Sequence, residues 1–321
     1  MKIIFLGTPH FAENVLRKLL ESKHEVVAVV CQPDKPVGRK QILEKPPVKI
    51  LAEEHNIPVY QFKKIRLEGV EVLSQLGADI MITAAYGQML SQEVLDITKY
   101  GVINVHGSVL PRYRGSSPIQ WSLINGEKTL GVTILQTHIG MDDGPILHTS
   151  EFDIMEDDTV ESLMEKISLL GADLLIKSLE EIENGTAVFV DQDESKATKC
   201  TMLKKENAKI DFNKSALEIE NFVRGNAEWP VAYTFIDNLM LKVYKAKRIK
   251  EDEFNTFDDM LKEKISSSKN GEVVLSTAKK GIIIKTEGGA IRLLEVQLEG
   301  GKKMDAKSFA NGNKLKEGMI L

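Results

Sequence analysis

Three side chains that can perform acid–base and hydrogen-bonding chemistry lie within one stretch of this sequence. Asn104 and His106 stand two residues apart at the end of an apolar run that is typical of a buried strand. Because side chains alternate along a strand, both should lie on the same face of a sheet. A second apolar run, residues 131–136, leads into a glycine-flanked turn that contains Asp142. The spacing therefore predicts that an amide, an imidazole and a carboxylate converge in one cleft.

This trio suits the attack of an amine on a carbonyl carbon. The reaction develops an anionic oxygen, which hydrogen-bond donors stabilise, and the amine must lose a proton. Asn104 can donate through its amide, His106 can donate when it is protonated, and Asp142 can relay the proton. A serine nucleophile is not indicated, because Ser108 lacks the G-x-S-x-G elbow, and no H-E-x-x-H or close His/Cys pair indicates a metal site.

The elements around the trio predict an α/β fold with a doubly wound, mostly parallel sheet. The chain opens with an apolar strand at residues 2–6, then the turn Gly7-Thr8-Pro9 and a helical pattern over residues 11–20. Further alternation of strands and helices implies right-handed parallel crossovers. In such sheets ligands bind at the carboxyl ends of the strands, where the trio lies. The first turn has one glycine instead of G-x-G-x-x-G, so a nicotinamide cofactor is not expected.

The length of 321 residues and the pattern along the chain predict two domains. We expect a catalytic domain over residues 1–184, a polar linker over residues 185–207 and a second domain over residues 208–321. Short alternating strands with glycine turns in the last segment are typical of a small C-terminal β-barrel of the oligonucleotide-binding (OB-like) kind. Residues 1–200 carry 20 Lys and Arg against 29 Asp and Glu, whereas residues 201–321 carry 22 against 18. The basic part is the better candidate for contact with a polyanion.

Composition also bounds the setting in which the chain works. Cys31 and Cys200 are the only cysteines, so neither a disulfide framework nor a thiolate metal site is expected. The chain opens directly with a strand and has no leader-like segment, and no apolar run approaches the ~20 residues that span a bilayer. These features predict a cytoplasmic protein without a membrane partner.

The stretch around the trio resembles the formyltetrahydrofolate-dependent formyltransferases. Their pattern N-x-H-x-S-L-L-P-x-x-R-G, followed by a G-x-D-x-G turn, is matched at residues 104–115 and 140–144, with Val109 in place of a leucine. The resemblance implies a Rossmann-like formyltransferase fold, with Asn104, His106 and Asp142 as the catalytic residues. It also implies 10-formyltetrahydrofolate as the formyl donor, with no metal, and folate contacts from Tyr86, Gly87, Ser108, Val109, Leu110 and Pro111.

Two basic regions resemble the members of this family that formylate initiator methionyl-tRNA. In those members a basic insertion with a Gly-Arg pair enters the acceptor end of the tRNA, and the Pro-rich loop at residues 32–47 contains such a pair. The patterns at residues 229–233 and 301–312 match the start and end of their C-terminal domain. The resemblance implies initiator methionyl-tRNA as the partner, with Arg39 at its acceptor end. From the clustering of basic residues we also expect tRNA contacts from Lys35, Lys40, Lys45, Lys245, Lys247 and Arg248, and we expect a monomer.

Other interpretations of these residues stay open at the level of sequence. The loop at residues 32–47 could be a solvated surface loop, and the lysines around residues 242–250 could protect a strand edge from aggregation. Tyr86 could be a core aromatic. The acceptor could be an amino sugar nucleotide or glycinamide ribonucleotide, although a basic loop and a basic β domain would serve neither. A non-catalytic RNA-binding protein with this fold is the alternative from another functional class.

Overall fold

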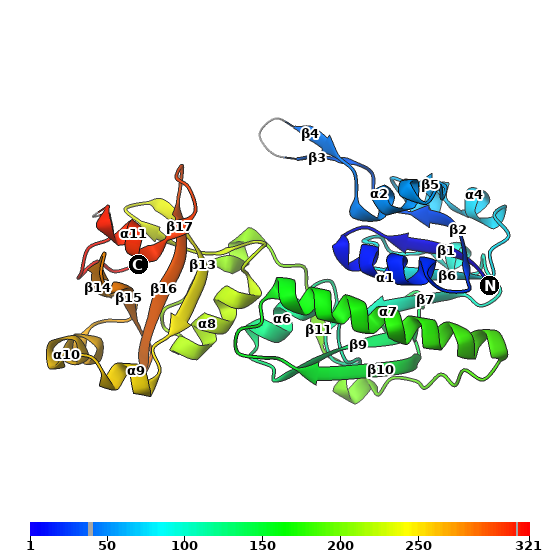
Figure 1. The fold of residues 1–321 in the computed structure, drawn as a ribbon. Coiled ribbons are helices and arrows are strands. Elements are labelled where there is room, and N and C mark those ends of the chain that lie inside the picture. The colour runs from blue at the N-terminus through cyan, green and yellow to red at the C-terminus, as the bar shows by residue number, and fades with distance from the viewer. Residues whose placement is uncertain (38–40, 313) are drawn as a thin grey trace. The chain divides into compact units, whose positions relative to one another are not determined.

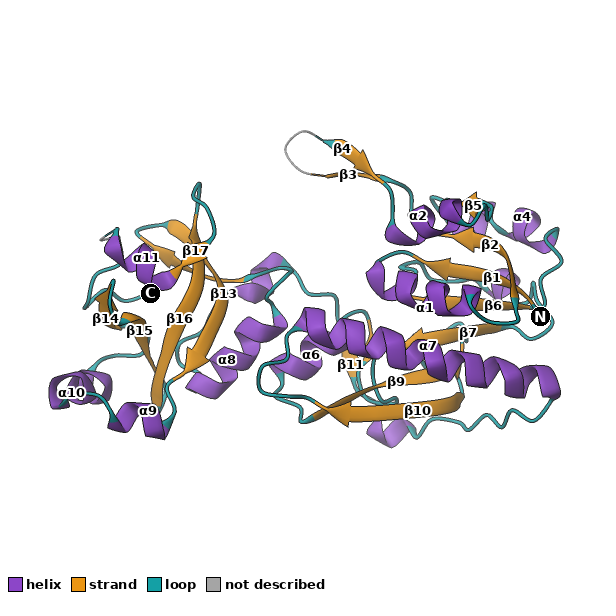
Figure 2. Cartoon of the chain, viewed as in Figure 1, coloured by secondary structure: helices purple, strands orange, loops and turns teal. Residues whose placement is uncertain are grey.

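The structure is a computed structural model that describes residues 1–37, 41–312 and 314–321. The chain folds into two compact units, whose elements are labelled in Figure 1 and distinguished by type in Figure 2. Neither unit is one continuous segment. Unit 1 consists of Met1–Pro118, Thr129–Ile154 and Ser162–Cys200, and unit 2 consists of Ile119–Lys128, Met155–Glu161 and Thr201–Leu321.

Unit 1 is built on a seven-stranded sheet. In pairing order its strands are β10 (Ile146–Asp153), β9 (Thr129–Gln136), β7 (Val102–His106), β6 (Ile80–Ala84), β1 (Lys2–Gly7), β2 (Glu25–Val30) and β5 (Val59–Tyr60). The five strands from β7 to β5 are parallel, and β9 and β10 each pair antiparallel with their neighbours. The predicted mostly parallel α/β sheet is therefore confirmed.

The helices of unit 1 cover this sheet with their apolar sides. They are α1 (His10–Leu20), α2 (Pro47–Glu54), α3 (Ile65–Glu68), α4 (Val70–Ser74), α5 (Gln92–Leu95) and α7 (Val160–Asn184), of which all but the first two residues belong to this unit. Residues Phe11, Val15 and Leu19 of α1 repeat at four-residue intervals and are buried, which is the spacing of one helix face. α7 packs closely on the sheet at Gly171, where an added Cβ would lie 2.7 Å from Val105.

A small hairpin extends the second crossover of unit 1. It consists of β3 (Lys35–Val37) and β4 (Ile42–Glu44), which pair antiparallel. The predicted basic loop at residues 32–47 therefore includes regular structure on both sides of residues 38–40. Ile42 and Leu43 of β4 are 65% and 69% exposed, so this hairpin presents apolar side chains to solvent.

Unit 2 contains an antiparallel sheet, as expected for the second domain. Its strands pair in the order β12 (Ala232–Ile236), β13 (Leu239–Arg248), β16 (Gly289–Leu298), β15 (Gly281–Thr286) and β14 (Val273–Thr277), and β17 (Met304–Asp305) also pairs with β16. Its helices are α6 (Pro118–Ile124), of which all but the first residue belongs to this unit, α8 (Ala216–Gly225), α9 (Glu251–Asn255), α10 (Asp259–Ser267) and α11 (Ala306–Asn311).

The core of unit 2 forms where α8 and α11 bury apolar side chains against the sheet. α8 begins with a capping box, in which the Ser215 hydroxyl accepts from the Glu218 amide and the Glu218 carboxylate accepts from the Ser215 amide. The patterns over residues 250–267 did not predict α9 and α10, because both helices are short and rich in charged residues. Among the described residues, no helix has the length and apolar character needed to span a membrane.

Candidate active site

Asn104, His106 and Asp142 converge in unit 1, as the sequence predicted. The Asn104 Nδ2 donates a hydrogen bond to Asp142 Oδ1 at 3.2 Å. The His106 Nδ1 lies 3.6 Å from Asp142 Oδ2. Asn104 and His106 come from alternate positions of β7, so both reach the carboxylate from the same face of the sheet. The carboxylate is the shared partner of the amide and the imidazole.

Thr83 at the end of β6 orients the Asn104 amide. The two residues are register partners in the parallel β6–β7 pair, and the Thr83 hydroxyl donates to Asn104 Oδ1 at 3.0 Å. Because an amide oxygen only accepts and its nitrogen only donates, this bond directs the Asn104 NH2 group toward Asp142. Sequence reasoning did not single out Thr83. Its only signal was a polar residue at the end of an apolar strand next to the one that carries the trio.

The loop after β7 wraps around the buried His106 ring. The His106 Nε2 lies 3.0 Å from the Tyr113 carbonyl oxygen. Because a carbonyl only accepts, Nε2 carries a hydrogen, and Nδ1 is the ring nitrogen that faces Asp142. Ser108 holds the same loop, since its hydroxyl donates to the Arg112 carbonyl at 2.7 Å. The imidazole is therefore fixed in orientation on both sides.

Asp142 sits at a turn position of unusual backbone conformation. Its φ is +52°, in the left-handed region that L residues rarely occupy. The Gly115 amide donates to Asp142 Oδ2 at 2.8 Å. An added Cβ on Gly115 would lie 2.1 Å from the Cys200 carbonyl oxygen, so a glycine is needed for this approach. The carboxylate thus receives donors from β7 and from β8 (Arg114–Gly115).

Residues 192–200, which the sequence pattern placed in a polar linker, contact the loop of the site. β11 (Lys199–Cys200) pairs in parallel with β8. The Gln192 Nε2 donates to the carbonyls of Asp142 and Gly144 at 2.8 and 2.7 Å. Arg114 is 5% exposed and forms an ion pair with Glu194, which raises the pKa of the arginine and lowers that of the carboxyl.

Two residues predicted to contact folate, Tyr86 and Gly87, follow β6. Tyr86 is 4% exposed and packs in an apolar cluster with Ile4 and Leu6. Burial raises the pKa of its hydroxyl, which has no hydrogen-bond partner among the described residues. Gly87 is exposed and has a φ of +87°. The Tyr86 ring is therefore part of the core, and its hydroxyl is a polar group that a ligand or a water molecule can bind.

The four predicted folate residues of the loop, Ser108 to Pro111, differ in exposure. Ser108 is 1% exposed and Leu110 is 5% exposed. The Thr133 hydroxyl connects them, because it donates to the Ser108 carbonyl at 2.7 Å and accepts from the Leu110 amide at 3.1 Å. Val109 and Pro111 are half-buried. Ser108 and Leu110 therefore hold the loop, and Val109 and Pro111 are the two that a ligand can reach.

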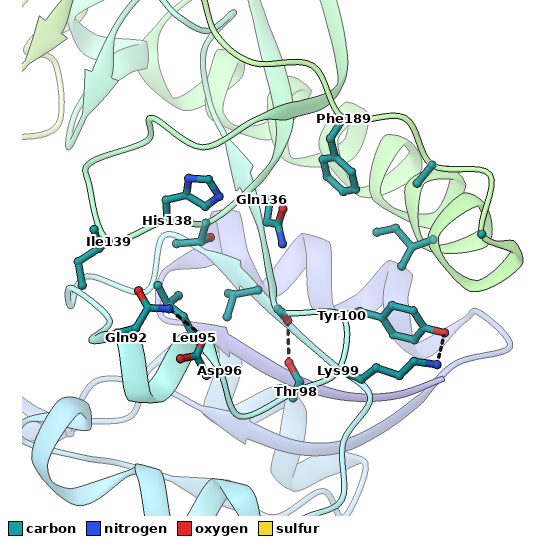
Figure 3. A pocket seen from close by; sticks show the side chains of 16 residues that line it. Gln92, Leu95, Asp96, Thr98, Lys99, Tyr100, Gln136, His138, Ile139 and Phe189 are labelled. Atoms are coloured by element: carbon teal, nitrogen blue, oxygen red, sulfur yellow. Dashed lines mark hydrogen bonds between the residues drawn. The ribbon is translucent and has the colours of Figure 1, made fainter.

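A cavity of about 830 Å³ lies beside the trio rather than around it. Figure 3 shows Gln136 and Phe189 on one side of it, and Lys99 and Tyr100 on the other. None of the three trio residues lines this cavity, but His138 does, from the same segment that carries Asp142. The cavity has the size of a small-molecule site, and its walls are partly aromatic.

The predicted tRNA contacts of the N-terminal hairpin are only partly within the described residues. Lys35 is exposed, and Lys45 pairs with Glu53 at 2.7 Å. Arg39 and Lys40 lie outside the residues that the structure describes. Both described lysines of this set are therefore exposed, and Lys45 has an acidic partner.

The predicted tRNA contacts of the β domain fall into two groups, those that pair with acidic side chains and one that is exposed. Lys247 lies 2.9 Å from Asp157 and 3.3 Å from Glu220. Arg248 lies 2.8 Å from Glu220 and 3.1 Å from Glu156. The Glu220 side chain is 2% exposed, so these cations neutralise a buried acid within unit 2. Lys245, by contrast, is exposed.

Comparison with known proteins places both parts of the chain in one family. The family model for "Formyl transferase" matches residues 1–179, and the model for "Formyl transferase, C-terminal domain" matches residues 202–314. The methionyl-tRNA formyltransferase of Geobacter metallireducens is 41% identical over 100% of this chain and 98% of its own length. That of Lachnospira eligens is 42% identical over 100% of this chain and 99% of its own length.

A solved structure shows the same fold at lower sequence similarity. HypX from Aquifex aeolicus, in complex with tetrahydrofolic acid, has a TM-score of 0.66 and 18% identity over 98% of this chain. This chain spans 48% of that protein, or about half its length. The matches confirm the resemblance inferred from the motif around the trio: the chain belongs to the formyl transferase family, among the methionyl-tRNA formyltransferases.

Proposed function

We propose that this protein transfers the formyl group of 10-formyltetrahydrofolate to the α-amino group of initiator methionyl-tRNA, for translation initiation in the cytoplasm. The observation that carries the proposal is the convergence of Asn104 and His106 on Asp142. It is supported by similarity to methionyl-tRNA formyltransferases over the whole chain. The proposed division of labour assigns the reaction to a domain at residues 1–184 and tRNA binding to a domain at residues 208–321, joined by residues 185–207.

The trio can divide the chemistry among its members. The Asn104 NH2 group has two hydrogens, and only one is directed at Asp142, so the second can donate to the oxygen that becomes anionic on the formyl carbon. His106 holds the same carboxylate in place from the other side. Asp142 accepts the proton of the attacking amine and returns it to the leaving nitrogen. The folate supplies the formyl carbon and that nitrogen, and the proposed reaction uses no metal.

The residues beside the trio fit a folate donor. The Tyr86 hydroxyl is buried without a partner in the described chain, and a polar edge of a bound ring would satisfy it. Tyr100 and Phe189 give the nearby cavity aromatic surface for a planar heterocycle. We propose that the donor lies between Tyr86 and the cavity, with Gly87, Val109 and Pro111 along its path. Ser108 and Leu110 act from behind, by holding the loop.

Unit 2 presents lysines with aromatic rings, which is the combination that binds RNA phosphates and bases. The Lys205 Nζ lies 5.5 Å from the centre of the Trp229 ring, which is 57% exposed. The Lys209 Nζ lies 5.8 Å from the Phe235 ring. Within the described chain neither lysine has an acidic partner. We propose that these pairs, together with Lys245, contact the tRNA.

The remaining predicted cations have different proposed roles. We propose that Lys35, Arg39, Lys40 and Lys45 contact the acceptor end of the tRNA, because the segment that carries them is basic in sequence and β4 exposes Ile42 and Leu43. Lys247 and Arg248 form ion pairs with Glu220, so we propose that they mainly stabilise unit 2.

The decisive assay follows formyl transfer from 10-formyltetrahydrofolate to methionyl initiator tRNA by wild type and by His106→Ala. An amino sugar nucleotide and glycinamide ribonucleotide serve as competing acceptors. We expect formylated tRNA from wild type alone. Formylation of a small acceptor in place of the tRNA would overturn the acceptor, and transfer by neither protein would overturn the enzymatic function.

The tRNA surface has a separate test in the salt dependence of tRNA binding. Replacing Lys205 and Lys209 by alanine should flatten the plot of log affinity against log salt by roughly one unit per lost phosphate contact. The matched control, Lys247→Ala, removes one cation of the same unit, and we expect it to lower the unfolding temperature with little change in slope. A salt-dependence slope for the Lys205 and Lys209 variant that equals the slope for Lys247→Ala would contradict the assignment of this surface.

A further inference from the structure

We propose that Gln192 is a positioning residue that sets the conformation of the turn carrying Asp142. The inference rests on the proposed function, since it concerns how the reacting carboxylate is held. Gln192 belongs to unit 1 and lies 50 residues beyond Asp142 in the chain, outside the motif of the family. It is half-buried, and its side-chain amide binds the turn.

The nitrogen of the Gln192 amide bridges the two ends of the turn. It donates to the Asp142 carbonyl at 2.8 Å and to the Gly144 carbonyl at 2.7 Å. An amide nitrogen has two hydrogens, so both are used in this contact. The two carbonyls lie on either side of residue 143, so one side chain clamps the turn at this point.

The oxygen of the same amide is held by Arg114. Arg114 donates to Gln192 Oε1 from Nε at 3.0 Å and from Nη2 at 2.9 Å. Since arginine only donates and carbonyls only accept, the amide has one satisfactory orientation, with its nitrogen on the turn. Arg114 is itself fixed by Glu194, which accepts from Nη1 at 3.0 Å and from Nη2 at 2.6 Å.

The clamp connects the turn to the strand that binds the Asp142 carboxylate. Gly115, next to Arg114, donates its amide hydrogen to Asp142 Oδ2 at 2.8 Å. Gly115 thus fixes the Asp142 side chain directly, and Arg114 fixes its backbone through Gln192. This matters because Asp142 has a φ of +52°, a conformation that L residues rarely adopt and that its surroundings help to maintain.

Charge explains why a neutral amide suits this position. Arg114, which binds Gln192, interacts electrostatically with Asp142, Asp143 and Glu194. Charged residues of the segment that carries Gln192 include Asp191, Asp193, Glu194 and Lys199. A carboxylate in place of the amide would keep the two bonds from Arg114. It would also set an acceptor oxygen against two carbonyl oxygens and add a negative charge near Asp142.

The test compares Gln192→Glu with Gln192→Met, which has nearly the same volume and neither accepts from Arg114 nor donates to the turn. For each protein we would measure kcat with methionyl-tRNA, the KM of both substrates and the unfolding temperature. We would also measure amide hydrogen exchange of residues 137–145. We expect kcat to fall about 10- to 100-fold in both variants, because a displacement of ~1 Å at a reacting group costs that much. We expect KM values within about threefold of wild type and faster exchange in the turn.

The two variants should rank in opposite order for activity and stability. Gln192→Glu keeps its Arg114 partner and should unfold at the higher temperature of the two, yet it should have the lower kcat. If kcat instead follows the unfolding temperature, Gln192 is only structural and the inference fails. Unchanged kcat or unchanged exchange in Gln192→Met, the variant without added charge, also overturns it, even if Gln192→Glu does not fold. A wild type that does not formylate the tRNA marks failure of the proposed function instead.

Discussion

Replacing Thr83 by valine tests whether the orientation of the Asn104 amide controls turnover. The substitution exchanges a hydroxyl for a methyl group of similar size and leaves the β6–β7 pairing intact. Thr83 is 8% exposed, and its hydroxyl lies 3.0 Å from Asn104 Oδ1. The valine therefore leaves that amide oxygen, on a half-buried side chain, without its donor.

The magnitude follows from the environment of this hydrogen bond. A neutral intramolecular hydrogen bond contributes about 0.5–1.5 kcal/mol to stability, and a buried acceptor that loses its partner costs about 1–3 kcal/mol. The Asn104 NH2 group acts in the transition state. If the lost hydrogen bond raises the activation free energy by about 1.4 kcal/mol, kcat falls roughly tenfold. A loss of 1–2 kcal/mol in stability lowers the unfolding temperature by about 2–8 °C for a domain of this size.

The assay is formyl transfer at saturating donor and tRNA, with KM values and thermal unfolding measured in parallel. We expect Thr83→Val to lower kcat about 5- to 30-fold with KM little changed, since the bond orients a catalytic group and does not contact substrate. Thr83→Ser keeps the hydroxyl and is the matched control, with kcat within about threefold of wild type. Equal kcat for Thr83→Val and wild type, or an equal loss in both variants, would refute the reasoning.

Three further predictions concern stability and reactivity. Hydrogen bonds and ion pairs with Lys23 and the N-terminus lower the pKa of the Glu183 carboxyl from 4.5 to about 2. Wild type should therefore be more stable than Glu183→Gln above pH 4.5, and this difference should disappear as the pH falls through about 2. Urea unfolding of both proteins across this pH range measures the difference. Burial raises the pKa of the Cys31 thiol to about 11 and also raises the pKa of the Cys200 thiol. A disulfide reagent that releases a chromophore should therefore react slowly with the native protein at pH 8, and it should react with two thiols after denaturation. Gly115→Ala should cost on the order of 3 kcal/mol of unfolding free energy, because an added Cβ meets the Cys200 carbonyl oxygen. The control Gly185→Ala, with φ of +72° and open space, should cost only about 1–2 kcal/mol.

The convergence of the trio could be predicted because it depends on local geometry. Asn104 and His106 alternate along one strand, and the pleat alone puts them on one face. Asp142 follows the neighbouring strand β9 after a glycine-bounded turn, which is a short-range pattern as well. The doubly wound fold follows from apolar runs alternating with helical periods in the same way.

The residues that hold the trio could not be predicted, because they depend on pairings between distant segments. Thr83 reaches Asn104 only through the register of two parallel strands, and periodicity does not specify register. Gln192 lies in a polar stretch that has no helical or strand pattern. Lys247 and Arg248 looked like free cations in the sequence, and their partners Asp157 and Glu156 come from a segment some 90 residues earlier.

The division of the chain into interleaved segments limits how this protein can be taken apart. Unit 2 includes Ile119–Lys128 and Met155–Glu161, which leave unit 1 and return to it before the chain passes finally to Thr201. The carbonyls of Met155, Glu156 and Asp158 accept from the Arg224 guanidinium of α8. A fragment that begins at residue 201 would lack these acceptors, and one that ends at residue 200 would carry them without their donor. A chimaera that exchanges unit 2 between relatives must therefore exchange three stretches of sequence together. The boundary between the two matched family models does not mark a place where the molecule can be cut.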